Sequence, residues 1–259
     1  MTRVDSYEDL TEDIVRWLKD YYYIHAIKAF VVGVSGGIDS AVVSTLCART
    51  GLPTYVVSMP LDSAAQDDRL SDDHTKWLEK KYENVERVRV ELFSAYDAFH
   101  KAIETWNGFL GREEKEFTSN EHANANTKSR IRMVTLYQIA GSVGGIVVGT
   151  GNKVEDYGVG FYTKYGDGGV DIAPIADLYK TEVRELGREI GVMPEIINAT
   201  PTDGLWEDGR NDEDQIGASY EELEEAMETG AGSGLEILQK FNAQNKHKMD
   251  PIPTYKLEV

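Results

Sequence analysis

The stretch AFVVGVSGGIDSAVVS, residues 29–44, indicates more about this chain than any other segment. The apolar run Phe30–Val32 predicts a buried strand, and apolar periodicity from Asp39 onward predicts a helix. Between them, Gly36 and Gly37 let the backbone approach a ligand and direct successive N–H groups at one point. Because the helix start adds free N–H donors and the positive end of its dipole, the turn predicts an anion-binding site.

Three side chains of this turn suit the binding of phosphate. Ser35 and Ser40 can donate hydroxyl hydrogen bonds to the same anion. Asp39 would repel a phosphate unless a cation lay between the two groups, and Mg²⁺ is the natural cation for that position. We therefore expect Asp39 to bind a magnesium ion beside the phosphates.

The turn differs from two widespread nucleotide-binding loops. A Walker loop has a lysine directly after its last glycine, and the G-x-G-x-x-G spacing marks dinucleotide-binding folds; neither pattern is present. The residues SGGIDS at 35–40 instead resemble the SGGxDS pyrophosphate loop of the N-type ATP pyrophosphatases at every fixed position. The resemblance implies an ATP site that includes Gly33, Val34, Ser35, Gly36, Gly37, Ile38, Asp39 and Ser40.

Further segments resemble motifs of the ammonia-dependent NAD synthetases, a family within this group. They are NANTKSRIRM at 124–133, GTGNKVE at 149–155, TKYGDGG at 163–169, LYKT at 178–181 and HK at 247–248. The resemblance runs in order from about residue 6 to residue 253. TKYGDGG is long and chemically unusual, which makes it highly specific.

This resemblance implies both a reaction and the residues that perform it. The nicotinate carboxylate of deamido-NAD would attack the α-phosphate of ATP, and ammonia would then displace AMP to give NAD. Mg²⁺ would be held by Asp39 and Glu155, while Asp167 would lie near the incoming ammonia; Asp39, Asp167 and Lys180 are the expected catalytic residues. Other implied ATP contacts are Thr150, Lys180 and Thr202. The implied deamido-NAD contacts are Arg130, Lys164, Asp171, His247 and Lys248, and a homodimer interface is expected to help bind this substrate.

The sequence pattern around the second motif gives independent support. The apolar run 146–148 predicts another buried parallel strand, so the loop after it would lie at the carboxyl edge of the sheet. Ligands of open α/β sheets bind at that edge. Thr150 and Glu155 would then face the same crevice as the SGGIDS turn, where Glu155 and Asp39 could share a magnesium ion.

Two segments allow more than one interpretation. Arg130 and Arg132 lie two apart on a predicted helix and point in different directions, so one can bind an anionic ligand while the other pairs with a surface carboxylate. The glycine-rich stretch 163–171 has the composition of a flexible hairpin tip. Its fixed charges equally suit recognition of a polar ligand.

Composition narrows the class of protein. A length of 259 residues and a hydrophobic fraction of 41% predict one α/β domain, 1–259, with a sizeable core. The net charge of −18 opposes nucleic-acid binding and resembles the acidic surplus of proteins from salt-loving organisms. No apolar run approaches the ~20 residues that span a bilayer, and the first residues do not read as a signal peptide. The single cysteine, Cys47, excludes a disulfide framework and favours a cytoplasmic location.

Alternating strand and helix patterns predict a parallel α/β sheet with right-handed crossovers. We expect a three-layer, Rossmann-like sandwich of the adenine-nucleotide α-hydrolase type, as the resemblance implies. Strands are expected at 29–34, 54–59, 85–92 and 146–149, and helices at 6–22, 41–50, 64–81, 95–106 and 126–143. The polar stretches 111–122 and 202–214 lack a core pattern and are expected to be mobile loops. The second is interpreted as a lid that closes through Leu205 and Trp206.

Ammonia is the expected nitrogen donor, because the synthetase pattern already occupies the chain and Cys47 lies on a predicted helix, a poor position for a glutaminase nucleophile. Two departures from the family are visible. Met249 follows the HK pair where relatives commonly have arginine, and the spacing between Glu155 and Lys164 varies among relatives. The alternatives are another amide-forming N-type pyrophosphatase, which would lack TKYGDGG, and a non-catalytic ATP-binding sensor, which would bind ATP without turnover.

Overall fold

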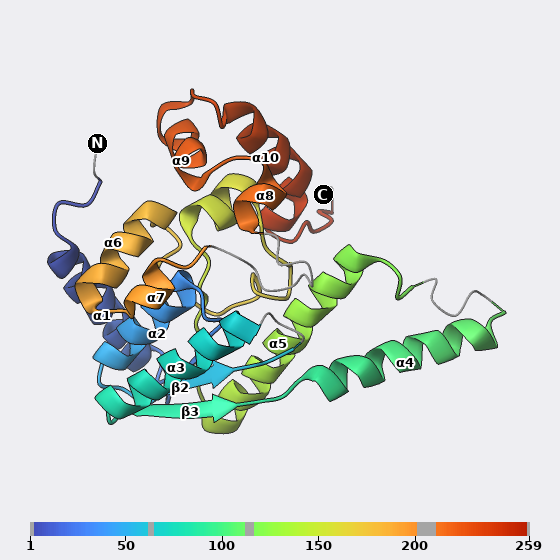
Figure 1. Cartoon of the computed structure of the whole chain (residues 1–259), viewed down its shortest axis with the longest axis horizontal. Helices are drawn as coiled ribbons and strands as arrows, with labels where there is room; N and C mark the ends of the chain where they lie inside the picture. Colours follow the sequence, from blue (N-terminus) through green and yellow to red (C-terminus); the bar gives the residue numbers. More distant parts are fainter. Residues whose placement is uncertain (1–2, 62–64, 112–116, 201–210, 258–259) are drawn as a thin grey trace.

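The centre of the fold is a parallel sheet of four strands in the order β3-β2-β1-β4 (Figure 1). The computed structural model describes residues 3–61, 65–111, 117–200 and 211–257. The strands are β1 Phe30–Gly33, β2 Thr54–Ser58, β3 Val85–Arg89 and β4 Ile146–Val147. All four expected strands are therefore confirmed, although each is shorter than its expected range, chiefly because the chain turns away at the carboxyl edge of the sheet.

Helices cover both faces of this sheet, which confirms the α/β class. Their bounds are α1 Tyr7–Ile24, α2 Ile38–Arg49, α3 Ala65–Lys81, α4 Phe93–Phe109, α5 Glu121–Val143, α6 Lys180–Ile190, α7 Pro194–Ile197, α8 Asp212–Ile216, α9 Tyr220–Thr229 and α10 Leu235–Met249. Val154–Val159 forms a π-helix, η1. Side chains of β1 alternate: Phe30 and Val32 pack with α1, α2 and α6, whereas Val31 packs with α5 on the opposite face.

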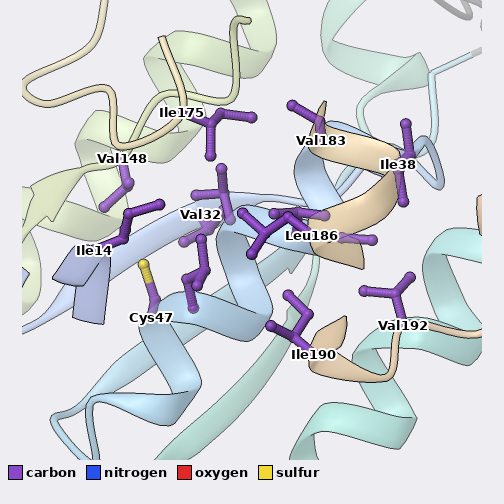
Figure 2. Packing of buried hydrophobic residues seen from close by; sticks show 14 of the residues in the cluster. Ile14, Val32, Ile38, Cys47, Val148, Ile175, Val183, Leu186, Ile190 and Val192 are labelled. Carbon is purple, nitrogen blue, oxygen red and sulfur yellow. The ribbon is translucent and has the colours of Figure 1, made fainter. Parts of the chain in front are cut away.

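Helix α2 lies at the centre of the larger core cluster. Figure 2 shows Ile38 and Cys47 of α2 together with Val32, Leu186 and Ile190 around them. The Cys47 side chain is completely buried, as expected for a small apolar residue at this position. Helix α2 is buried around most of its circumference, beyond the apolar positions that predicted it, and this packing fixes the turn that precedes the helix.

The strand order determines where a ligand can bind. From β1 the chain moves outward to β2 and β3, and it later returns to place β4 on the other side of β1. The chain after β1 runs toward β2 on one side, whereas β4 lies on the other side of β1. Where the strand order reverses in this way, the loops after the two neighbouring strands separate and leave a crevice at the carboxyl edge of the sheet. The sheet order thus brings the SGGIDS turn and the GTGN loop together.

The C-terminal helices α8, α9 and α10 form a separate layer at one end of the molecule (Figure 1). They share a third core cluster with η1, to which Val154, Val159, Ile216, Tyr220 and Leu223 contribute. Through this cluster the C-terminal helices pack against the segment that carries Glu155.

Two expected loops are shorter than predicted. Helix α5 begins at Glu121 because Asn120 accepts a hydrogen bond from the Ala123 N–H, so residues 121–122 are helical. Residues 212–214 form the first turn of α8, which Asn211 caps in the same way. Residues 112–116 and 201–210, including Leu205 and Trp206, lie outside the described residues. No helix in the described part of the chain is long and apolar enough to cross a membrane.

Candidate functional site

A pocket of about 490 Å³ opens at the carboxyl edge of the sheet. Its lining contains the complete SGGIDS turn with Gly33 and Val34, as predicted. Thr150, Glu155 and Lys180 also line it, so segments separated by more than a hundred residues meet in one cavity. The sequence placed Thr202 there as well, but this residue lies outside the described part of the chain.

The backbone shape of the SGGIDS turn requires glycine at only one of its two glycine positions. Gly36 has a φ of +98°, and a Cβ at this position would lie 2.6 Å from the Asp67 carbonyl oxygen at the start of α3. Gly37 has a φ of −82°, which any residue can adopt. No side chain caps α2, so N–H groups of its first turn remain available to an anion.

The two serines of the turn are bonded to the turn itself. Ser40 is buried; its hydroxyl donates to the Gly37 carbonyl at 3.0 Å and accepts from the Ser35 N–H at 3.1 Å. The Ser35 hydroxyl accepts from the Gly37 N–H at 3.2 Å. Their first role is therefore to hold the turn in shape, and the expected role as hydroxyl donors to an anion stays a prediction.

A charge cluster lies in the same pocket, and it includes Asp39 of the turn itself. The ammonium of Lys180, whose side chain is only 3% exposed, bonds to the carboxylate of Asp39 and, at 3.1 Å, to Oε1 of Glu155. Burial by itself lowers the pKa of Lys180, but the two carboxylates outweigh it and the pKa is raised, so the amine stays charged. Burial raises the pKa of Asp39, and the Lys180 ammonium opposes that shift.

Two neighbouring side chains fix these carboxylates. Asn152 is fully buried; its amide N–H donates to Oδ1 of Asp39 at 3.4 Å, and its carbonyl accepts the N–H groups of Val154 and Glu155 at the start of η1. The Tyr220 hydroxyl, from α9, donates to Oε1 of Glu155 at 2.7 Å. The cluster is consequently supported from both the GTGN loop and the C-terminal helices.

The carboxylates of the charge cluster provide oxygen ligands for a cation, but they do not surround it on all sides. In the described part of the chain, no three His, Cys, Asp or Glu side chains converge as a complete metal site. The carboxylates of Asp39 and Glu155 do converge on one point, now taken by the Lys180 ammonium. Because Mg²⁺ at phosphate sites typically takes one or two carboxylates plus phosphate and water oxygens, these two residues fit that ion.

Comparison with known proteins defines the family. The sequence pattern of the family described as "NAD synthase" matches residues 10–252. The chain belongs to the NAD synthase family. The NH(3)-dependent NAD(+) synthetase of Finegoldia magna is 35% identical over 245 residues, which cover 94% of each chain.

Solved structures agree with this membership. The NMN synthetase from Francisella tularensis superposes with a TM-score of 0.87 and 32% identity, over 98% of this chain and 100% of that one. The NAD+ synthetase from Burkholderia pseudomallei gives a TM-score of 0.74 and 25% identity, over 95% and 91% of the two chains. The parallel-sheet fold is thus shared with an NMN synthetase and an NAD+ synthetase.

The TKYGDGG segment of this NAD synthase family member places one aspartate at the pocket. Asp167 Oδ1 accepts hydrogen bonds from the Ser129 hydroxyl at 2.6 Å and from the Thr163 N–H at 3.1 Å. Desolvation by the surrounding protein raises the pKa of this carboxyl despite these bonds. Asp156 also lines the pocket, and its pKa is raised to about 7 by burial and by the neighbouring carboxylate of Glu155.

Most residues predicted to bind the dinucleotide lie outside this pocket. Only Lys248 lines it; its ammonium donates to the Tyr162 carbonyl at 2.6 Å, and burial lowers its pKa. Arg130 points outward and donates to the Lys164 carbonyl at 3.2 Å. Asp171 accepts from the Val147 N–H at 2.8 Å, at the end of β4. His247 is exposed on α10, so the substrate role of these four residues stays a prediction.

The structure also separates the two arginines of α5. Arg132 contributes to the pocket wall and its guanidinium donates to the Met59 carbonyl at 3.3 Å. Arg130 lies on the outer surface, as the spacing of two along a helix requires. The sequence anticipated the divergence but not which arginine enters the pocket.

Sequence reasoning missed one residue that lines the pocket, Asp156, and two that bond to its carboxylates from behind, Asn152 and Tyr220. Asn152 belongs to the GTGN motif, and a buried amide after a strand was a usable signal. Asp156 did not stand out, because the sequence contains many acidic residues. Gly151 leaves space for its side chain, since a Cβ at position 151 would lie 2.3 Å from an Asp156 oxygen. Tyr220 follows a capping box in a polar helix and carries no local signal, since only packing brings it to Glu155.

Proposed function

We propose that this chain catalyses the ATP-dependent amidation of deamido-NAD with ammonia, which gives NAD, AMP and pyrophosphate. The observation that carries the proposal is the meeting of the SGGIDS turn, Lys180, Asp39 and Glu155 in one pocket of an NAD synthase family member. A turn without its own lysine suits a leaving pyrophosphate better than γ-phosphoryl transfer, for which a Walker lysine reaches the terminal phosphates.

The first step joins the substrate to AMP. The free N–H groups at the start of α2 and the Lys180 ammonium hold the β- and γ-phosphates. A nicotinate carboxylate oxygen attacks the α-phosphorus, the bond to pyrophosphate breaks, and an adenylylated ester forms. The protein contributes positioning and charge stabilisation and no nucleophile of its own.

Asp39 and Glu155 would hold Mg²⁺ in this complex. Their side chains are each 16% exposed and face the same point, as the carboxylates of a shared ion must. The ion would supply positive charge to the phosphate oxygens as pyrophosphate departs. Both carboxylates can bind the cation only if the Lys180 ammonium releases them. The ammonium would then bind the phosphates instead.

The second step takes ammonia as the nitrogen donor. Ammonia attacks the activated carbonyl carbon, the bond to the adenylate oxygen breaks, AMP leaves with that oxygen, and the nitrogen releases one proton to give the neutral amide. Asp167, held at the pocket by Ser129 and Thr163, is the residue we assign to the incoming ammonia. Cys47 does not serve as a glutaminase nucleophile, because its side chain is fully buried and burial raises the pKa of its thiol.

The proposed chemistry is tested by isotope transfer. Deamido-NAD labelled with ¹⁸O in its nicotinate carboxylate is incubated with ATP, ammonia, Mg²⁺ and the purified chain, and the products are analysed by mass spectrometry. One ¹⁸O atom is expected in the phosphate of AMP. ADP with label in inorganic phosphate would refute adenylylation, and ATP binding with no turnover would favour a sensor. Replacing ammonia by ammonia-free glutamine should abolish NAD formation.

A second substrate is supported by a specific similarity. The Francisella tularensis NMN synthetase shares more of its structure with this chain than the Burkholderia pseudomallei NAD+ synthetase does, at TM-scores of 0.87 and 0.74. The same two steps would convert nicotinate mononucleotide into NMN, because the reacting carboxylate is identical. The ratio of kcat/KM for the mononucleotide and the dinucleotide decides between the two acids.

A homodimer is the arrangement that we propose for the outer substrate residues. Figure 1 shows α4 projecting from the body, and this helix exposes Phe99, Trp106 and Phe109. On α5, Val134 is 70% exposed and lies one turn from Arg130 on the same face. A partner that covers this apolar surface would also cover Arg130. Analytical ultracentrifugation should show a dimer, and Val134→Glu should weaken both the dimer and the binding of deamido-NAD.

A further inference from the structure

Tyr220 connects the C-terminal helices to the charge cluster. Its side chain is completely buried at the start of α9, with its ring among Val154, Ile216 and Leu223. The ring is thereby fixed in position, and the hydroxyl reaches the wall of the pocket that carries the charges. A tyrosine at a purely apolar site would leave this hydroxyl without a partner, at a cost comparable to a lost hydrogen bond.

The hydroxyl contacts two carboxylates and the ring faces the amine. It lies 2.7 Å from Oε1 of Glu155 and 3.3 Å from Oδ2 of Asp212, and the Lys180 ammonium lies 4.9 Å from the ring centroid. A phenol has one proton, which the shorter distance assigns to Glu155. Burial and the nearby carboxylates raise the pKa of Tyr220 far above its usual value, so the hydroxyl remains a donor.

The segment that carries Glu155 is held by the same helices at a second point. Glu155 lies in the π-helix η1, a conformation that is rare and needs outside support. Helix α10 supplies that support: Asn242 donates to the Gly158 carbonyl at 2.9 Å, and Asn245 donates to the Val159 carbonyl at 2.8 Å. The position of Glu155 therefore depends on α9 through its side chain and on α10 through its backbone.

We propose that Tyr220 is a positioning residue that orients Glu155, and through it Lys180, for binding of the ATP phosphates. The inference rests on the proposed function, in which Glu155 and Lys180 both serve ATP. The C-terminal helices consequently set the geometry of a site whose recognisable motif lies near the other end of the chain.

The physical reason is a competition for the lysine. Oε1 of Glu155 accepts hydrogen bonds from both Tyr220 and Lys180. Without the hydroxyl, this oxygen would keep Lys180 as its remaining donor, and the carboxylate torsion is soft enough to turn toward the amine. The carboxylate would then retain the ammonium that the phosphates need, and ATP would bind more weakly.

The test compares two tyrosine-to-phenylalanine variants. Tyr220→Phe removes the hydroxyl at the site, whereas Tyr22→Phe removes a hydroxyl that donates to the Lys28 carbonyl at 3.1 Å, away from the pocket. Calorimetric binding of ATP with and without Mg²⁺, kcat, KM for ATP and thermal unfolding are measured for both. Tyr220→Phe should lose on the order of tenfold in ATP affinity, the effect of one hydrogen bond to a charged group, while Tyr22→Phe should match the wild type.

A double mutant separates positioning from general destabilisation. In a Glu155→Ala background, Tyr220→Phe should cause little further loss of ATP affinity, because the carboxylate that the hydroxyl orients is absent. ATP affinity of Tyr220→Phe within twofold of the wild type would overturn the inference. Equal losses with and without Glu155→Ala would overturn it too, since they would indicate a structural role alone.

A third measurement covers the case in which Tyr220→Phe does not fold. With 3-fluorotyrosine at position 220 of the full chain, ATP should shift the ¹⁹F resonance; an unchanged resonance at saturating ATP would overturn the inference. Failure of the proposed function is a separate result: the wild type would bind ATP without converting either pyridine nucleotide acid. The ATP affinities of the variants would still decide the role of Tyr220.

Discussion

The SGGIDS turn and the charge cluster, two parts of the same pocket, are built in different ways. The SGGIDS turn consists of consecutive residues, held by its own serines and by the positive φ of Gly36. The charge cluster joins Asp39 of this turn to Glu155 and Lys180 from two distant segments, and Tyr220 from a further segment supports it. The turn is thus a local structure that needs a helix behind it, whereas the cluster exists only when the whole chain is folded.

This difference leads to different expectations for mutations. A change in the turn should weaken ATP binding and cost stability only through local backbone strain, because the shape of the turn is set within a few residues. A change in the cluster should affect both catalysis and folding, since removing one partner of a buried ion pair leaves the other charge uncompensated. The following predictions test that contrast.

The largest effect is expected for Lys180→Met. The substitution leaves the carboxylates of Asp39 and Glu155 close together without a cation. We expect the free energy of unfolding to fall by about 3 kcal/mol, as for other broken buried ion pairs, and kcat/KM to fall by at least ~1000-fold because phosphate charge loses its stabilisation. Lys153→Met, which removes a partly exposed pair with Asp177, is the control and should cost less than about 1 kcal/mol. Equal destabilisation by the two variants would contradict the contrast.

Asp39→Asn should have the next largest effect. The amide keeps the volume of the carboxylate but lacks the charge that would bind Mg²⁺ beside the phosphates. Turnover should fall at least ~100-fold, as it does when a principal charge-stabilising element is lost. Steady-state rates over a range of Mg²⁺ concentrations measure the effect. Near-normal activity would falsify the metal assignment of Asp39.

Gly36→Ala tests the turn. The added Cβ would lie 2.6 Å from the Asp67 carbonyl oxygen, and alanine disfavours a φ of +98°. Backbone strain of this kind costs about 1–3 kcal/mol, so denaturant unfolding should show a decrease of that size in the free energy of unfolding. ATP should bind at least ~10-fold more weakly, which corresponds to about 1.4 kcal/mol of binding free energy. Gly37→Ala is the matched control for stability, because its Cβ would meet only Ser35 Oγ, at 3.4 Å. A larger stability loss in Gly37→Ala would show that the assigned turn geometry is wrong.

The smallest effect on the ATP site is expected for His74, which lies behind the turn. Its ring is buried, bonds to Ser44 of α2 at 3.1 Å, and has a pKa lowered to about 4, chiefly by burial. Because the unfolded state binds a proton below about pH 6.5 and the folded state does not, stability is present above that pH and is lost as pH falls toward 4. In this range the free energy of unfolding should change by up to about 1.4 kcal/mol per pH unit, the slope expected for one proton.

Urea unfolding at several pH values measures that slope. His74→Gln should flatten it between pH 6.5 and 4, while ATP affinity at neutral pH changes little because His74 does not line the pocket. A pH dependence of stability that is identical in His74→Gln and in the wild type would assign the protons to other groups.

The sequence by itself determined the parts of this protein that depend on neighbouring residues. The run Phe30–Val32, the glycines after it and the periodicity of α2 predicted strand, turn and helix, because strand pleating, positive φ and helical spacing act over a few residues. Alternation of such units predicted the parallel sheet. The rule that ligands bind at the carboxyl edge of an open sheet then gave the correct expectation that Thr150 and Glu155 line the same pocket as the turn.

The tertiary structure alone decided which charges meet and which do not. Tyr220 reaches Glu155 only because α9 packs on η1, and Lys180 lies between Asp39 and Glu155 only because α6 packs on α2. Arg130 lies within one of the family motifs and Asp171 follows another, yet both lie outside the pocket. Side-chain packing between remote segments sets these positions. The pKa of a buried charged group depends on its neighbours and on its removal from water, and no local sequence pattern encodes either effect.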